Sequence, residues 1–341
     1  MDQSGLEDLI SGWGERSFRS RQLFEGLYRH RWTEWGAFTN LSRSLRERLE
    51  NSVDLVWPRI VESLGSADTS TKHAFQLSDG VCIEGVHMPY EDRATLCLSS
   101  QVGCAMGCVF CATGQMGIIR NLSAAEIVGQ VMALLIQHEH PIGRPVNLVF
   151  MGMGEPLHNL EHVMAAFRIL TDPKGLAIPP RRITLSTSGL VSAIRRLAAF
   201  SPRPRLALSL NGTTDERRSR LMPVNRVWGL DALAEALASF PCEKDEKITL
   251  EYVLMKGETD TDEDAKRLVA FAKRFPSKIN LIPFNLHEGS GFEPPAERRI
   301  DALCRYLSGQ GLIVSVRRSR GQDVAGACGQ LVRELGNSSF I

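Results

Sequence analysis

The chain has 341 residues, of which 43% are hydrophobic and 23% are charged, and its net charge at pH 7 is +1. This length and composition fit one large folded domain or two to three smaller ones, and they exclude a fibrous or disordered protein. The near-zero net charge excludes a protein that binds nucleic acid over its whole surface, although a local basic patch is compatible with it.

No run of about 18 apolar residues occurs, which argues against a membrane-spanning helix. The first residues, MDQSGLEDLI, lack the basic and apolar regions of a secretory signal. We therefore expect a cytoplasmic protein that makes no membrane contact.

The first 52 residues are expected to form a small helical domain. Apolar residues recur near a period of 3.6 over residues 18–28, and a second helix is expected over residues 41–49, after the cap-like Thr39 and Asn40. Arginines dominate the charged residues of the first half: Arg16, Arg19, Arg21, Arg29 and Arg31 stand against Glu25 alone. Such a face fits a solvated surface and an RNA-phosphate contact equally well.

Residues 53–92 lose the helical period and are expected to form a β-hairpin or meander that links the helical domain to the rest. Strand-like runs cover residues 59–64, 71–77 and 81–88, and Asp79-Gly80 is a hairpin signal.

Residues 93–341 alternate between apolar strands and helices. The expected strands are residues 94–99, 146–151, 183–187, 206–210, 248–254 and 279–284, with a further one at 312–316. The helix over 124–137 begins with a capping box formed by Ser123 and Glu126. Six βα units predict an α/β fold, either an open partial barrel or a doubly wound sheet, and in both the chemistry belongs at the carboxyl ends of the strands.

A cysteine triplet follows the first of these strands. Residues 101–111 read QVGCAMGCVFC, which places Cys104, Cys108 and Cys111 in a glycine-containing loop. Three thiolates can hold a [4Fe-4S] cluster and leave one iron open to a ligand. The alternative is a structural zinc site with Cys97 as fourth ligand, which would indicate a non-catalytic RNA-binding protein.

The triplet, with Phe110 before its last cysteine, resembles the cluster loop of the radical S-adenosylmethionine (SAM) superfamily. Five segments in order resemble the RlmN/Cfr family of RNA adenosine methyltransferases: TLCLSSQVGC (95–104), MGMGEP (151–156), TLSTSG (184–189), KINLIPFN (278–285) and ACGQL (327–331). The resemblance spans nearly the whole chain and includes FRSRQLF (18–24) in the helical domain.

The resemblance implies a partial (β/α)6 radical SAM barrel with a small N-terminal helical domain. It also implies methylation of carbon 2 (RlmN type) or carbon 8 (Cfr type) of an adenosine in large-subunit ribosomal RNA, with transfer RNA as a further substrate of the RlmN type. These ring carbons have no lone pair to attack a sulfonium methyl group, so a radical route is needed. We expect carbon 2, with carbon 8 as the alternative, in a monomer that receives electrons from a donor such as flavodoxin.

The resemblance also assigns residues. One [4Fe-4S] cluster would be held by Cys104, Cys108 and Cys111, and two SAM molecules would be used per turnover. Cys328 matches the cysteine that carries the methyl group, Cys97 the thiol that resolves the RNA adduct, and Glu84 the base. The matching SAM positions are Gly154, Glu155, Ser186, Ser209, Leu210, Asn211 and Asn285. The family's usual residue at Asn211 is histidine, which puts the detail of that contact in doubt.

Some of these residues have simpler interpretations. Without the resemblance, Glu84 reads as a solvent-facing charge. Cys82, Cys242 and Cys304 match no motif and are expected to be buried free thiols. Cys328 lies in a glycine-rich loop, residues 321–329, after three arginines, so we expect a movable loop whose cations favour both the thiolate and RNA phosphate.

Overall fold

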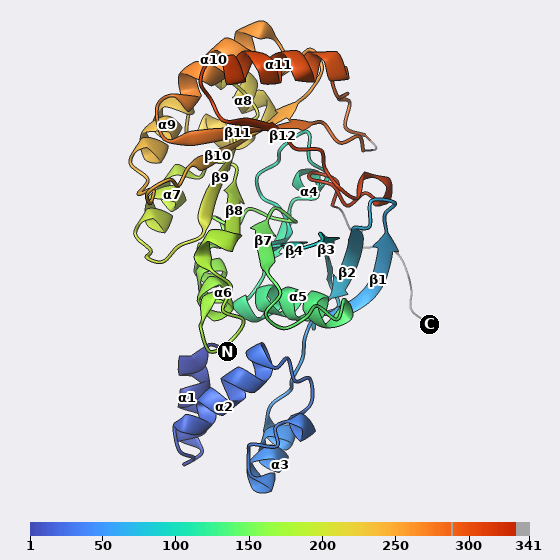
Figure 1. Cartoon of the computed structure of the whole chain (residues 1–341), viewed down its shortest axis with the longest axis vertical. Coiled ribbons are helices and arrows are strands. Elements are labelled where there is room, and N and C mark those ends of the chain that lie inside the picture. Colours follow the sequence, from blue (N-terminus) through green and yellow to red (C-terminus); the bar gives the residue numbers. More distant parts are fainter. Residues whose placement is uncertain (288, 332–341) are drawn as a thin grey trace.

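The computed structural model describes residues 1–287 and 289–331, and one ten-stranded sheet forms its main body (Figure 1). The strands are, in spatial order, β1 (Arg59–Gly65), β2 (Thr71–Gln76), β3 (Cys82–Pro89), β4 (Ala94–Cys97), β7 (Val146–Phe150), β8 (Ile183–Thr187), β9 (Arg205–Ser209), β10 (Ile248–Leu254), β11 (Ser277–Pro283) and β12 (Val314–Val316). Strands β1 to β4 pair antiparallel, and from β4 to β12 every pairing is parallel. A doubly wound sheet reverses its strand order. The parallel strands here keep chain order, so the fold is an open partial barrel.

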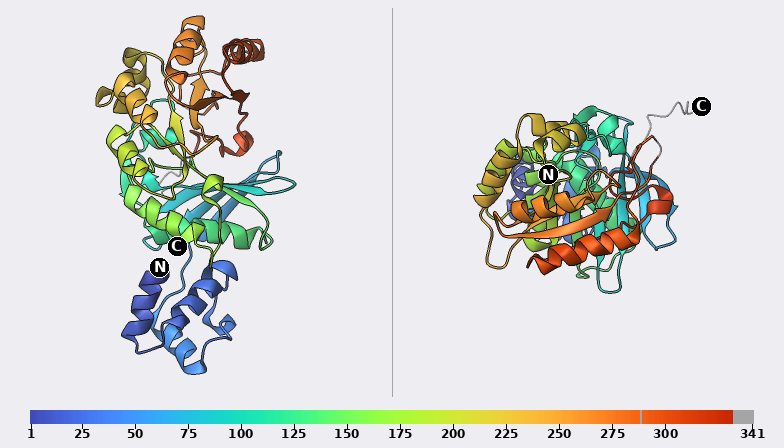
Figure 2. Two further views of the ribbon diagram at one scale, coloured as in Figure 1. Left: turned by 60° about the vertical axis from the view of Figure 1, so that its left-hand side comes forward. Right: turned by 90° about the horizontal axis from the view of Figure 1, so that it is seen from above.

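The helices lie on the outer side of the curved sheet, as the view from above in Figure 2 shows. They are α5 (Ala124–Gln137), α6 (Leu160–Thr171), α7 (Val191–Ala198), α8 (Asp215–Leu221), α9 (Leu230–Ala238), α10 (Asp262–Ala272) and α11 (Glu297–Gly309). Helix α5 begins with the predicted capping box: Ser123 Oγ accepts from the Glu126 amide at 3.2 Å, and Glu126 Oε2 accepts from the Ser123 amide at 2.8 Å. None of the helices in the described ranges is long and apolar enough to cross a lipid bilayer.

Strand alternation gives the sheet two different faces. Leu148, Leu185 and Leu250 point to the helices and are fully buried. Their neighbours along the chain point to the inside of the barrel and are polar at many positions, as at Ser186 and Glu251. Side chains on one face of a strand recur every second residue, so the same short runs build the core and line the interior.

Two local predictions need correction. The strand expected over 94–99 ends at Cys97, and the chain continues into a separate two-stranded ribbon of β5 (Gln101–Gly103) and β6 (Ile118–Asn121). The helix expected over 41–49 is α3 (Arg43–Ser52), and its N-cap is Ser42, whose Oγ accepts from the Leu45 amide at 3.3 Å. The predicted cap at Thr39 and Asn40 is therefore wrong.

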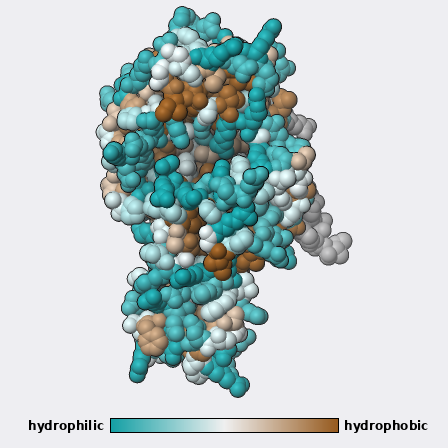
Figure 3. Space-filling view, viewed as in Figure 1, coloured by the Kyte–Doolittle hydropathy of each residue, from teal (hydrophilic) through white to brown (hydrophobic). Residues whose placement is uncertain are grey.

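The N-terminal helices form a separate lobe at the lower end of the molecule (Figure 1). The lobe contains α1 (Gln3–Gly12), α2 (Phe18–Phe24), a π-helix (Glu25–Arg29) and α3, and Arg31 Nη1 donates to the His140 carbonyl at 2.5 Å. Figure 3 shows a mainly hydrophilic face, with smaller apolar areas near the upper end and where this lobe meets the main body. The strands of residues 53–92 continue the main sheet through β3 and β4. The boundaries at residues 52 and 92 stay predictions.

Four histidines cluster where β2 and β3 meet the end of α5. His73 Nε2 lies 2.8 Å from His138 Nε2, and the His87 ring stacks on that of His138 with 3.7 Å between centroids. Burial, with the neighbouring His138 as a second cause, lowers the pKa of His73 to about 4 and that of His87 to about 3. Burial also lowers the pKa values of His138 and His140. The cluster is therefore neutral at pH 7.

We expect the free energy of unfolding to fall as the pH drops below about 6.5, because the unfolded histidines take up protons there and the folded ones do not. The loss continues until the folded cluster titrates at about pH 4 to 3. Urea unfolding at about pH 7.5 and about pH 5.5 should differ by about 1 kcal/mol for each of His73 and His87.

The double variant His73→Gln/His87→Gln should flatten this pH dependence, and the exposed control His30→Gln should retain it. A double variant with the wild-type pH dependence would contradict this explanation.

Candidate active site

A cavity of about 160 Å³ lies at the carboxyl ends of the parallel strands. Predicted site residues from the cluster loop, four strand ends and the C-terminal loop line it: Cys104, Cys108, Cys111, Gly154, Glu155, Ser186, Ser209, Asn211, Asn285 and Cys328. Glu84, Cys97 and Leu210 do not line this cavity. The predicted location at the strand ends is therefore right for most of the set.

The cysteine loop is shaped by a tight approach between backbones. Gly103 has φ +74°, and a Cβ there would collide with the Gly117 carbonyl, so glycine is required. The Cys104 amide donates to that same carbonyl at 2.8 Å. This hydrogen bond fixes the start of the loop, and all three thiols line the same cavity.

The three thiols of the triplet are close neighbours in this cavity. Burial raises the pKa of Cys104 to about 12 and raises those of Cys108 and Cys111, and the three thiols act on one another electrostatically, so they are neighbours. Within residues 1–287 and 289–331, no three His, Cys, Asp or Glu side chains form a closed single-ion site. A [4Fe-4S] cube spaces its ligands more widely than zinc does. Nor does Cys97 line the cavity beside them, as a four-thiolate zinc site would need.

The turn after β7 presents a buried carboxylate. Gly154 has φ +98°, and a Cβ there would lie 2.5 Å from the Gln101 Cβ, so a side chain cannot fit. Glu155 Oε2 accepts from the Ser188 amide at 2.7 Å, and Oε1 accepts from the Leu157 amide at 3.0 Å. Burial raises the pKa of Glu155 despite these hydrogen bonds. A cationic ligand in the cavity would favour its ionised form.

Polar side chains from β8, β9 and β10 share one wall. Ser186 Oγ donates to Glu251 Oε2 at 2.9 Å and lies 3.4 Å from Ser209 Oγ. Asn211 has φ +47°, a conformation that asparagine tolerates better than most residues, and its Oδ1 accepts from the Val253 amide at 2.9 Å. Leu210 is fully buried, and its carbonyl accepts from Arg218 Nε at 2.9 Å. The Leu210 side chain is therefore part of the core, and its carbonyl helps to hold Arg218.

The C-terminal loop is fastened against the cluster loop. Asn285 Nδ2 donates to the Cys328 carbonyl at 2.9 Å and to Ser319 Oγ at 3.0 Å. The Ala112 amide, just after the cysteine triplet, donates to the Gly329 carbonyl at 2.8 Å. These bonds hold Cys328 at the cavity wall.

Cys97 and Cys328 form a second pair of neighbouring thiols. Burial, with Cys328 as second cause, raises the pKa of Cys97 to about 12. Burial also raises the pKa of Cys328, although Arg317 acts in the opposite direction. Arg317 thus favours the Cys328 thiolate, as expected of a nearby cation, but desolvation has the larger effect on the pKa. Arg317 Nη1 also pairs with Glu251 Oε1 at 3.1 Å.

Glu84 is buried, with 3% of its surface exposed, so the solvent-facing interpretation is wrong. Its Oε1 lies 3.2 Å from Lys72 Nζ, which is itself mostly buried. Val86 is paired with Cys97 across β3 and β4, so Glu84 and Cys97 share one face of the sheet.

The three unmatched cysteines lie outside the site. Cys82, Cys242 and Cys304 do not line the cavity. They are half-buried, which corrects the expectation of full burial.

The sequence analysis did not predict two buried charged residues at or beside the cavity, Glu251 and Arg218. Glu251 stands within the apolar run ITLEYVL of β10, and a carboxylate in such a run is a usable signal. Arg218 is fully buried and donates to the carbonyls of Leu210 and Ser188 and to Asn225 Oδ1. It occurs among exposed charges in DERRSRL, so its role could be found only in three dimensions.

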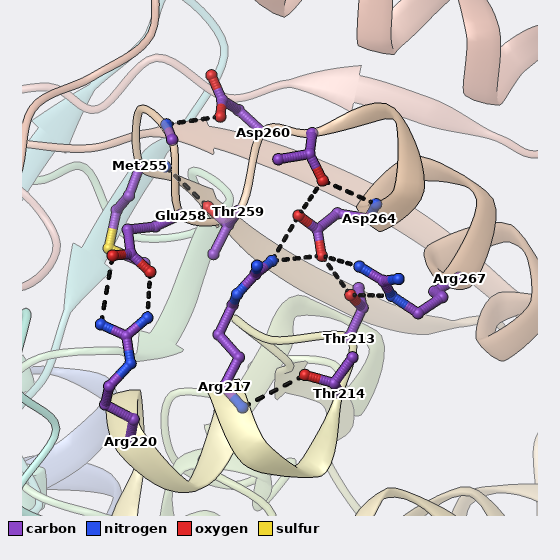
Figure 4. Close-up of polar contacts among 12 residues, drawn as sticks. Thr213, Thr214, Arg217, Arg220, Met255, Glu258, Thr259, Asp260, Asp264 and Arg267 are labelled. Carbon is purple, nitrogen blue, oxygen red and sulfur yellow. Dashed lines mark hydrogen bonds and ion pairs between the residues drawn. The ribbon is translucent and has the colours of Figure 1, made fainter.

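A buried ion network supports the loop that carries Asn211 (Figure 4). Asp264 accepts from Arg217 Nη1 at 2.6 and 2.7 Å and from Arg267 Nη2 at 2.9 Å, and Thr213 Oγ1 donates to it at 2.5 Å. Burial alone would raise the pKa of Asp264, but hydrogen bonds from Thr213, Thr261 and Arg267 lower it. The network joins α8 and α10 to the residues that follow β9.

Comparisons with known proteins agree with these features. Residues 98–269 match the Radical SAM superfamily, and residues 1–55 match the ribosomal RNA large subunit methyltransferase N-terminal domain. The chain is 47% identical over 332 residues to the dual-specificity RNA methyltransferase RlmN of Geotalea uraniireducens, covering 97% of this chain and 94% of that one. It is 47% identical over 324 residues to RlmN 2 of Myxococcus xanthus, covering 93% and 85%. A solved radical SAM methyltransferase from Sphaerobacter thermophilus matches with a TM-score of 0.93 and 40% identity, covering 98% of both chains.

We expect Asp264→Ala to lower the free energy of unfolding by about 3–5 kcal/mol, because it leaves Arg217 without its buried partner. Glu258→Ala is the matched control, since it removes an arginine partner from the same region (Figure 4) but at a more exposed ion pair, with Arg220. The control should cost about 1 kcal/mol or less. Chemical denaturation of both variants tests this, and equal losses would contradict the assigned role of Asp264.

Proposed function

The chain belongs to the RlmN family of radical SAM methyltransferases, and on that basis we propose that it methylates carbon 2 of an adenosine in large-subunit ribosomal RNA and also acts on transfer RNA. The observation that carries the proposal is the single cavity lined by both the cysteine triplet and Cys328. A structural zinc site could use the same four thiols, so iron content and RNA methylation distinguish the two functions.

The cofactors are proposed from the same cavity. Cys104, Cys108 and Cys111 would hold one [4Fe-4S] cluster. Glu155 would bind the ammonium group of SAM, and Ser186 and Ser209 would hydrogen-bond its polar atoms. When bound, the cluster supplies the electron that cleaves SAM and so activates the methyl group carried by Cys328.

Cys328 is proposed to carry the methyl group. Its sulfur displaces the sulfonium of a first SAM: a sulfur–carbon bond forms to the methyl, and S-adenosylhomocysteine leaves. The fastening of the loop by Asn285 keeps this sulfur within the cavity wall, where a second SAM can act on the methyl. Two SAM molecules are thus used per turnover.

Cys97 and Glu84 are proposed to release the product. The Cys97 thiolate attacks the Cys328 sulfur, and a disulfide forms. The bond from that sulfur to the methylene breaks, its electron pair goes to the carbon, and a proton completes the methyl group on adenine. Glu84, on the same sheet face as Cys97, acts as the base: the ring carbon loses its hydrogen to Glu84 as a proton when the adduct forms, and the bound cluster would take up the remaining electron. A dithiol reductant then restores both thiols.

The remaining partners follow from this chemistry. We propose that a low-potential electron donor such as flavodoxin reduces the cluster. We further propose that the enzyme works as a monomer in the cytoplasm, where its RNA substrates occur.

Anaerobic reaction with SAM, a reductant and a ribosomal RNA fragment tests the function, with mass spectrometry of the digested nucleosides. We expect 2-methyladenosine; 8-methyladenosine would assign the Cfr-type reaction instead. The purified protein should be brown with about four irons. A colourless zinc protein that methylates neither ribosomal RNA nor transfer RNA would refute the proposal.

Replacing Cys328 and replacing Cys97 should stop the reaction at different steps, because the two thiols act one after the other. Cys328→Ala has no methyl carrier and should transfer no carbon to RNA. Cys97→Ala should still become methylated at Cys328 and add to adenine, but it should accumulate a denaturation-resistant covalent complex with RNA. Gel electrophoresis with labelled RNA detects the complex. Its absence, with the cluster and Cys328 methylation intact, would refute Cys97 as the resolving thiol.

Replacing a cysteine of the triplet should abolish cluster binding, whereas replacing an unmatched cysteine should not. Cys108→Ala should lose the cluster and with it reductive cleavage of SAM, because two thiolates do not retain the cluster in active form. Cys242→Ala is the control: it lies outside the cavity and should keep both the cluster and turnover. Iron content and 5'-deoxyadenosine formation measure the difference, and full 5'-deoxyadenosine formation by Cys108→Ala would overturn the cluster assignment.

A further inference from the structure

A second cavity, of about 580 Å³, enters the partial barrel from the opposite end to the first. Eight of its lining residues are cations, and Glu251 is its single carboxylate. The cations are Arg93, Arg181, Arg182, Arg205, Lys278, Arg317, Arg318 and Arg320. The net charge of the whole chain is only +1, so the positive charge of this cavity is a local concentration.

The two cavities meet inside the barrel. The second is lined by residues at the amino ends of the strands, such as Asn147 on β7, Arg205 on β9 and Lys278 on β11. Met151 and Glu251 line both cavities. Among the residues that the structure describes, only these two side chains are common to both walls, so the amino-end cavity and the cavity of the cysteine triplet are direct neighbours.

Half of the cations in this cavity lack a carboxylate partner. Arg93, Arg317, Arg318 and Arg320 lie within 4 Å of Asp or Glu oxygens. Across the part of the chain that the structure describes, Arg181, Arg182, Arg205 and Lys278 form no such ion pair.

The unpaired cations also disfavour one another. Burial lowers the pKa of Lys278, and the neighbouring Arg205 lowers it further. Repulsion of this kind in a half-buried position is relieved when an anion binds between the cations.

We propose that this amino-end cavity binds the phosphates that flank the target adenosine, so that single-stranded RNA enters the barrel from the end opposite the cluster. The inference rests on the proposed function, and it adds the path and the residues by which the substrate is held. Arg205 and Lys278 are the central contacts, with Arg181 at the exposed rim.

The position of the two thiols favours this path. Cys97 is the last residue of β4, and its neighbour across the sheet, Val149, lines the amino-end cavity. Cys328 lines the other cavity, and the two thiols act on each other electrostatically. A base that arrives from the amino end therefore meets the sulfur pair at the junction, while SAM occupies the far side.

The rim of the cavity suits a nucleotide strand. The guanidinium groups of Arg93 and Arg320 lie 4.5 and 5.0 Å from the centre of the Tyr90 ring, which is 38% exposed. Aromatic rings with arginines beside them bind unstacked bases and their phosphates. An acidic electron-donor protein would instead approach the cluster loop, at the other end of the barrel.

The test measures RNA affinity as a function of salt for Arg205→Gln/Lys278→Gln, with a short RNA hairpin that contains the target adenosine. We expect binding to weaken about tenfold and the slope of log Kd against log salt to fall by about 1 to 1.5, as for two lost contacts to single-stranded phosphates. SAM affinity should not change. The control Lys273→Gln/Arg298→Gln removes the same charge from exposed positions at the C-cap of α10 and on α11, and it should match the wild type.

The outcomes separate the two proposals. If the wild-type enzyme with its cluster methylates the hairpin and the double variant keeps the wild-type Kd and salt slope, the phosphate site is overturned and the function stands. If the wild type methylates no RNA, the proposed function fails, and the phosphate site fails with it. Slower reduction by flavodoxin with unchanged RNA binding would assign the cavity to an acidic protein and also overturn the phosphate site.

Single variants guard against a folding defect. If the double variant loses SAM binding, RNA binding is measured instead for the single variants Arg205→Gln and Arg181→Gln. Both replace residues at exposed positions. Each should lower the salt slope by about 0.7, the effect of one phosphate contact, and an unchanged slope in both would overturn the proposal.

Discussion

The structure depends on the division of each parallel strand between an apolar outer face and a polar inner face. Helices cover only the outside of the open barrel, so the outer positions, such as Leu148 and Leu250, form the core. The inner positions have no apolar layer to pack against. In a closed barrel they would be filled by branched side chains. Here many of them are polar or charged, such as Ser186, Lys278 and Glu251, beside apolar ones such as Val149 and Ile282, and the interior is left as two neighbouring cavities.

The ion pair of Glu251 and Arg317 stands where these cavities meet. Glu251 also accepts from Ser186, so one carboxylate joins a wall of the proposed SAM site to the strand end beside the two thiols. Arg317 lowers the pKa of both Cys97 and Cys328, yet burial dominates and keeps them neutral. A neutral thiol is a poor nucleophile, because attack on a sulfur or carbon electrophile requires the thiolate. Each of the proposed steps at these two sulfurs therefore requires that the attacking thiol first lose its proton.

The sequence predicted what depends on local spacing and left out what depends on long-range pairing. The strands, the capping box at Ser123 and the cysteine triplet are all carried by short patterns. The burial of Glu84 is not, because it follows from the pairing of β3 with β4 and from Lys72 on β2. Arg218 likewise becomes significant only when three separate loops present their acceptors to it. Only the family resemblance made Glu84 a candidate, and its role stays a proposal.

The C-terminal loop shows what the β1–β3 meander contributes. The glycine-rich loop after β12 is hydrogen-bonded to the turn between β1 and β2, where Asp323 accepts from Ser66 Oγ at 2.5 Å and from the Ala67 amide at 3.0 Å. That this loop moves stays a prediction. Its other side is bonded to the cluster loop through the Gly329 carbonyl. Cys328 therefore lies between two segments of the loop that are each hydrogen-bonded to another part of the chain. The meander is thus more than a connection between domains, since it holds one end of the loop that carries the proposed methyl carrier.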